Sequence, residues 1–364
     1  MEAASAAPQL ANGQSGAHHA NGHATDLSQV LSALQAIYEP SSSNETRRHA
    51  TEYLEEAKRH PEAPSNGYTL ARDHAQPAQL RHYGLTMLEF SIRYKWEDFS
   101  EEQGTALRNY VVELAQSVSA EDPVYLRNKV AQLWTEVAKR SWGAEWMNMD
   151  EQLVELWRTS LHHQAVVLYV LEALSEEIFN REDTTAGLRS SDLGRACVEI
   201  FTPTQVLVEH LPTRDKSLNV RHGDEGWLRR LCDNLSWCLS QDNQDQDAVK
   251  LSAVKTMNAL RACMPWVIPK AIAAVQVIEH VCKALAVPVV ELQVVRATPF
   301  LPSLPNTNHN FFRLLSMFSR QYTLATTSTM MNLSSSCAPC SRLGASHCCV
   351  TFTIGPWLIW TSTI

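Results

Sequence analysis

Residues 88–96 read LEFSIRYKW and residues 134–142 read WTEVAKRSW, so a similar pattern of apolar, cationic and indole side chains recurs after 46 residues. The alignment places Arg93 on Lys139 and Trp96 on Trp142. A period of about 40–47 residues is typical of HEAT and armadillo repeats, in which each unit is a pair of antiparallel helices. Because one pair cannot bury its apolar face alone, neighbouring pairs stack. The repeat therefore predicts an all-α, HEAT/armadillo-like α-solenoid, a right-handed superhelix of helix pairs.

The sequence around this repeat also favours helices. Of 364 residues, 45% are hydrophobic and only 13 are glycine, and apolar side chains recur at helical spacing from Leu27 onward. The spacing predicts helix pairs over 27–61, 76–118 and 124–161, and further pairs to about residue 287, within an array that covers residues 27–295. Ser100 and Gln103 have the spacing of a capping box at the start of one helix.

Tryptophans gather where the predicted helix pairs turn. Aromatic side chains at such positions either pack a repeat corner or form a platform for a ligand. Packing is favoured, since aromatic residues at helical spacing usually bury their area. The tryptophans assigned to corner packing are Trp96, Trp142, Trp146 and Trp266.

The two ends of the chain differ from the array. Residues 1–26 are rich in Ala, Gly, Asn, Ser and His, and predict a disordered leader that is neither a secretory signal nor a transit peptide. Residues 301–364 contain no Asp, Glu or Lys, although the chain has 39 acidic residues. We therefore expect residues 296–364 to be an atypical, poorly ordered tail, the end of a truncated or out-of-frame gene product.

Two other interpretations of the tail were weighed. A zinc site could use Cys337, Cys340, His347 and Cys348, but the tail has a single CxxC pair and no standard ligand spacing follows it. A membrane anchor would need about 20 apolar residues, and the apolar end is shorter. The sequence therefore predicts no bound metal and no membrane partner.

Composition and motifs limit the function classes. The net charge of −8 argues against DNA as a partner. The chain lacks a Gly-rich phosphate loop, HExxH and GxSxG, so neither an enzyme nor a cofactor is predicted. Its nine cysteines fall mostly within apolar helical patterns, as in proteins of the nucleus or cytosol.

Four motifs follow one another along the chain: NETRRHATEYLEEAKRHP (44–61), HYGLTMLEFSIRYKW (82–96), KVAQLWTEVAKRSWGAEWMNMDEQL (129–153) and ACMPWVIP (262–269). In this order they resemble the importin-β/exportin (karyopherin-β) superfamily, and within it the exportin-5-like branch. The first motif is similar to the N-terminal karyopherin signature, the next two resemble the following repeats, and the last resembles a later corner. The signature positions are Arg48, Ala50, Glu52, Leu54, Lys58 and Pro61.

The resemblance implies a nuclear transport receptor that binds the small GTPase Ran in its GTP form, carries protein or structured RNA cargo, contacts Phe-Gly nucleoporins and shuttles between nucleus and cytoplasm. In this superfamily the second helices of the N-terminal pairs face Ran, which points to the helices near 44–59 and 101–118. The residues carried over are Glu52, Glu56, Arg108 and Asn109. A helical scaffold that binds proteins without Ran, and a non-functional truncated product, stay open as alternatives.

Overall fold

A computed structural model describes residues 27–180, 183–210, 220–241, 246–287 and 292. Within these residues every regular element is a helix, and an isolated bridge joins Trp142 to Trp146. The predicted leader and the tail, with its cysteine cluster, lie outside the described residues. The helices are α1 (Leu27–Tyr38), α2 (Asn44–Ala57), α3 (Ala63–Arg72), α4 (Ala78–Tyr94), the short 3-10 helix η1 (Trp96–Asp98), α5 (Glu101–Gln116), α6 (Val124–Ser141), α7 (Met149–Trp157), α8 (Leu161–Glu177), α9 (Thr184–Leu188), α10 (Ser190–Phe201), α11 (Thr204–His210), α12 (Gly226–Ser240), α13 (Gln246–Cys263), α14 (Pro269–Val275) and α15 (Val277–Ala286).

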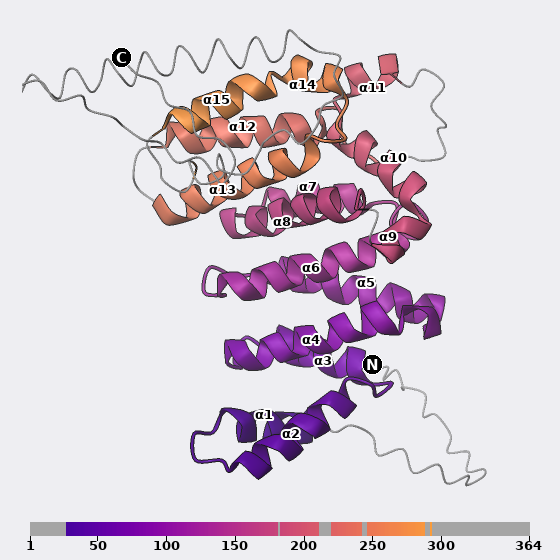
Figure 1. The fold of residues 1–364 in the computed structure, drawn as a ribbon, viewed down its shortest axis with the longest axis vertical. Helices are drawn as coiled ribbons and strands as arrows, with labels where there is room; N and C mark the ends of the chain where they lie inside the picture. The colour runs from indigo at the N-terminus through magenta and orange to yellow at the C-terminus, as the bar shows by residue number, and fades with distance from the viewer. Residues whose placement is uncertain (1–26, 181–182, 211–219, 242–245, 288–291, 293–364) are drawn as a thin grey trace, which may run out of the picture. The chain divides into compact units, whose positions relative to one another are not determined.

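Consecutive helices form pairs that stack in sequence order (Figure 1). The pairs are α1–α2, α3–α4, α5–α6 and α7–α8, and their second helices α4, α6 and α8 pack side by side, with α13 next to α8. We call α2, α4, α6, α8 and α13 the second-helix layer, and α1, α3, α5 and α7 the first-helix layer. This stacking is that of an all-α, HEAT-like solenoid, which confirms the predicted fold class.

The pairing differs from the prediction by one helix after the first pair. The sequence pattern misses α3, so it pairs the helix at 76–96 with α5 and the helix at 124–142 with α7. The structure instead pairs α4 with α3 and α6 with α5. Helix α3 is hard to recognise because it contains Pro64 near its start and Gly67 in its interior, where glycine costs about 1 kcal/mol relative to alanine.

Glycine is present in α3 because α3 and α4 approach each other closely. A Cβ atom on Gly67 would lie 2.8 Å from the carbonyl oxygen of Gly84, and one on Gly84 would lie 2.6 Å from the carbonyl oxygen of Gly67. Neither backbone could accept a methyl group without moving. The residue that weakens the helical signal of α3 is thus the one that its packing requires.

The tryptophan-rich corner between α6 and α7 is part of the core. Trp142 follows the last residue of α6, Trp146 lies in the turn, and both side chains are fully buried. Trp134 packs on Trp146 with ring centroids 5.1 Å apart. The turn itself uses Gly143 at φ +75°, a conformation that other residues rarely adopt.

The other two corner tryptophans are partly buried and pack against the same core cluster. Trp96 lies in η1, and the edge of its ring is 3.8 Å from where a Cβ on Gly104 would be. Trp266 stacks on Phe179 with centroids 4.6 Å apart and meets Phe201 edge-on.

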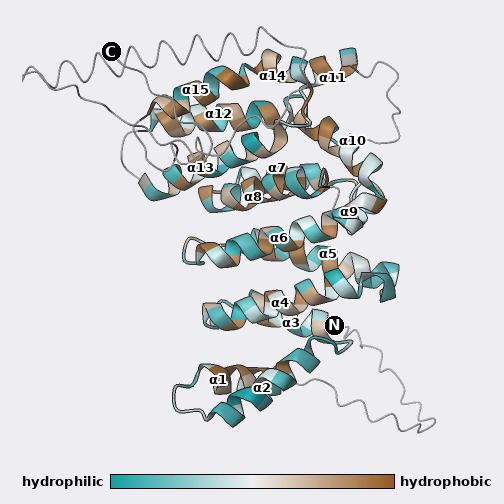
Figure 2. Cartoon of the chain, viewed as in Figure 1, coloured by the Kyte–Doolittle hydropathy of each residue, from teal (hydrophilic) through white to brown (hydrophobic). Residues whose placement is uncertain are grey.

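The start of α5 follows the local sequence rules closely. At α5 the Ser100 hydroxyl accepts from the Gln103 amide, and the Gln103 side chain accepts from the Ser100 amide, so the predicted capping box is confirmed. Figure 2 shows the helices as amphipathic, with α2 mostly hydrophilic. Helix α2 thus presents an unusually polar surface on the second-helix layer.

Candidate partner-binding surface

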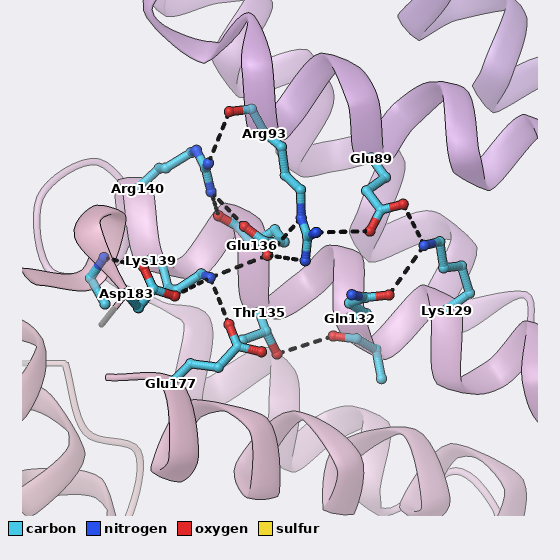
Figure 3. A network of polar contacts seen from close by, with 12 residues as sticks. Glu89, Arg93, Lys129, Gln132, Thr135, Glu136, Lys139, Arg140, Glu177 and Asp183 are labelled. Atoms are coloured by element: carbon cyan, nitrogen blue, oxygen red, sulfur yellow. Dashed lines mark hydrogen bonds and ion pairs between the residues drawn. The ribbon is translucent and has the colours of Figure 1, made fainter. Parts of the chain in front are cut away.

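The second-helix layer is held together by a network of charged side chains at the level of α4, α6 and α8 (Figure 3). At its centre lies Glu136 of α6, whose side chain is only 3% exposed. One carboxylate oxygen accepts from Arg93 of α4 at 2.7 Å, and the other accepts from Arg140 at 2.8 Å. The network therefore joins the second and third helix pairs through a buried carboxylate.

The environment of Glu136 keeps it ionised. Burial by itself would raise the pKa of its carboxyl group, but the positive charges of Lys139, Arg140 and Arg93 outweigh burial and hold the pKa below its ordinary value. A buried carboxylate of this kind needs all of these partners, because an unpaired charge in the interior is costly.

Lys139 extends the same network to the fourth helix pair. Its ammonium group donates to Glu177 of α8 at 2.6 Å and to Asp183, the N-cap of α9, at 2.9 Å. Burial would lower the pKa of Lys139, but these two carboxylates raise it above the ordinary value. Lys139 therefore stays charged and links α6 to α8 and α9.

On the opposite side of Arg93 the network reaches Glu89, also on α4, at 3.6 Å. Glu89 in turn accepts from Lys129 of α6 at 2.5 Å. Four basic and four acidic groups alternate in this network, and its contacts cross every boundary between α4 and α8 in the second-helix layer. The network ties α4, α6 and α8 to one another through charged side chains.

Glu52 and Glu56, two of the residues carried over for Ran, lie on α2 in the second-helix layer. Their side chains are 63% and 77% exposed. Glu52 is 3.8 Å from Arg48, and Glu56 is 3.2 Å from Arg59. Exposed pairs of this kind contribute little to stability, so both carboxylates are free to be used in binding.

Arg108 and Asn109 lie on α5, which the structure places in the first-helix layer. The expectation that α5 is a second helix was wrong, because it rested on the pairing that missed α3. Arg108 donates to the carbonyl oxygen of Glu145 at 2.9 Å and so supports the corner between α6 and α7. The four carried-over residues therefore lie on helices of two different layers.

The sequence did not reveal a cleft of about 470 Å³ between α7, the start of α8 and α12. The indoles of Trp157 and Trp237 line it, together with the side chains of Arg158 and Arg230. Trp237 is 42% exposed. Glu225 and Asp233 also line it, so the cleft offers indole surfaces together with both cationic and anionic side chains.

Within the described ranges, no group of three or more His, Cys, Asp or Glu side chains could hold a metal ion. No described helix combines the length and the apolar character needed to cross a membrane.

Comparison with known proteins shows which family has these repeats. The model of the importin-beta N-terminal domain matches residues 50–117, and the model of exportin 1-like protein matches residues 123–197. The two matches follow each other along α2 to α10, in the order of the stacked pairs. Over these residues the chain is similar to the importin-β/exportin family.

Individual relatives agree with this assignment. Protein MSN5 of Saccharomyces cerevisiae is 28% identical over 306 residues, which are 80% of this chain and 24% of that protein. Exportin-5 of Dictyostelium discoideum is 23% identical over 164 residues, covering 45% of this chain and 14% of the relative. Exportin-5 of Homo sapiens is 27% identical over 154 residues, covering 41% and 13%. The expected exportin-5-like resemblance is confirmed.

The chain spans about a quarter or less of the length of these importin-β/exportin relatives. None of the relatives named above carries the name of an enzyme, which supports a non-enzymatic function at the level of the family.

Proposed function

We propose that these repeats belong to an exportin-like nuclear transport receptor that binds Ran in its GTP form. The observation that carries the proposal is the pair of adjacent family matches over residues 50–117 and 123–197, which fall on the stacked helices α2 to α10. The receptor carries protein cargo, with structured RNA as a second cargo class, and contacts Phe-Gly nucleoporins as it moves between nucleus and cytoplasm.

The Ran-binding surface of this proposal is the second-helix layer at the start of the array. Helix α2 contributes the exposed carboxylates Glu52 and Glu56. Helices α4, α6 and α8 support it, because the Glu136 and Lys139 network fixes their relative positions. Arg108 and Asn109 are not part of this surface, since α5 belongs to the other layer.

The preference of the chain for Ran–GTP over Ran–GDP tests this function. The chain would be immobilised, and the binding of Ran loaded with a non-hydrolysable GTP analogue would be compared with that of Ran–GDP. We expect the GTP form to bind about tenfold more tightly, a difference of about 1.4 kcal/mol. Equal binding of the two forms, or no binding of either, would instead favour a helical scaffold that binds proteins without Ran.

A further inference from the structure

The helix pairs are not equally coupled to their neighbours. In a repeat array each unit contacts only the units beside it, so each interface determines how independently a unit moves. One hydrophobic cluster runs without interruption from Tyr68 to Leu292. In the second-helix layer, ion pairs add to it between α4 and α6 and between α6 and α8. The pairs from α3–α4 to α7–α8 are therefore strongly joined.

The first pair has a separate core. Val30 and Leu34 of α1 pack with Leu54 and Ala57 of α2, and from the second pair this cluster takes Leu70 and Leu80. None of the ion pairs found among the described residues joins α1 or α2 to a later helix. The apolar and electrostatic coupling across this junction is thus weaker than at the next two.

Among the described residues, two hydrogen bonds from α4 and its C-cap residue reach the first pair, and both attach near the C-terminal end of α2. The Tyr83 hydroxyl of α4 donates to the carbonyl oxygen of Leu54 at 2.6 Å, and the Lys95 ammonium group donates to the carbonyl oxygen of Arg59. Helix α2 begins at Asn44, nearly three turns before Leu54. These hydrogen bonds consequently attach the first pair at one end of α2.

The second helix pair, α3–α4, is packed too closely for its two helices to move relative to each other. Helices α3 and α4 meet at Gly67 and Gly84, where the backbones are too close for even one added methyl group. Two helices packed this closely move together as a rigid body, and motion concentrates in the segment that connects this body to its neighbour. Here that connection is the short segment 58–62 between α2 and α3.

We propose that the α1–α2 pair pivots as a unit about the C-terminal end of α2, with residues 58–62 as the hinge and the Tyr83–Leu54 hydrogen bond as its restraint. The pivot changes the separation of α2 and α4 in the second-helix layer. A partner that contacts both helices would therefore be accommodated by movement of the first pair. The movement itself does not depend on which partner binds.

Distance distributions measured by pulsed electron paramagnetic resonance test the pivot. Spin labels would be attached through non-canonical residues, because the chain has nine cysteines. In one labelled protein the labels are at Thr51 on α2 and Gln116 on α5, and in the reference protein they are at Gln116 and Glu155 on α7. All three residues are exposed. We expect the Thr51–Gln116 distribution to be about twofold broader than the reference. Equal widths would overturn the proposal.

A matched pair of variants tests the restraint. Tyr83→Phe removes the hydroxyl that reaches Leu54, and should broaden the Thr51–Gln116 distribution further. Tyr38→Phe removes a hydroxyl from an exposed side chain at the end of α1, and should leave the distribution unchanged. If Tyr38→Phe broadened the distribution as much as Tyr83→Phe, the assigned restraint would be wrong.

Discussion

Glu136 shows how one residue can determine the coupling between repeats. Its carboxylate is shared by Arg93, Lys139 and Arg140 in a buried position. Glu136→Gln keeps the shape of the side chain and removes the charge, which leaves three cations close together. Removing one partner of a buried ion pair costs about 3 kcal/mol, so we expect a loss of this size in the free energy of unfolding, measured with urea.

The control for this variant is Glu52→Gln, which changes an exposed carboxylate near Arg48 and should alter the stability by less than about 0.5 kcal/mol.

The pH dependence of the free energy of unfolding tests the same residue in a second way. The pKa of Glu136 is lower in the folded chain than its ordinary value, so its contribution is present at neutral pH and is lost as the pH falls below about 4.5. The variant should lose less stability than the wild type on acidification, and an equal loss would contradict the assigned role.

At the scale of elements, the crossing of α3 and α4 depends on glycine. In Gly84→Ala the new methyl group would lie 2.6 Å from the carbonyl oxygen of Gly67 and 2.8 Å from the amide nitrogen of Ala71. Overpacking of this kind costs about 2 kcal/mol, more than the helix propensity of alanine returns. The melting temperature should therefore fall.

The matched substitution is Gly104→Ala in α5. There the nearest atom to the new methyl group is a ring carbon of Trp96 at 3.8 Å, an ordinary contact distance. The melting temperature of this variant should stay the same or rise, since alanine favours the helix by up to about 1 kcal/mol. A similar loss in both variants would show that the close approach of α3 and α4 is not the cause.

The same glycines explain what the sequence could and could not predict about elements. Long helices with regular apolar spacing, such as α4 and α6, were predicted within a few residues, and the Ser100 cap was found from its spacing. Helix α3 was missed because Pro64 and Gly67 weaken its helical pattern, and the reason for Gly67 is a contact with a helix further along the chain. Local propensity does not contain that information.

At the scale of the whole molecule, the 46-residue period was enough to predict the fold class, because a repeat of that length determines how neighbouring units bury their apolar faces. It was not enough to decide which helix belongs to which layer. That assignment required α3, and without it α5 was placed with the second helices. Glu52 and Glu56 therefore lie in the second-helix layer, where they were expected, whereas Arg108 and Asn109 lie on a helix of the other layer.

A charge reversal on each layer tests whether the start of the second-helix layer binds Ran. Glu52→Lys with Glu56→Lys reverses two exposed carboxylates on α2, and Glu101→Lys with Glu102→Lys makes the same change at exposed positions on α5. The dissociation constant of Ran loaded with a GTP analogue would be measured for both variants and for the wild type. We expect the affinity to fall about tenfold for the α2 variant and less than about twofold for the α5 variant. Equal losses of affinity, or a larger loss for the α5 variant, would show that the second-helix layer is not the binding surface.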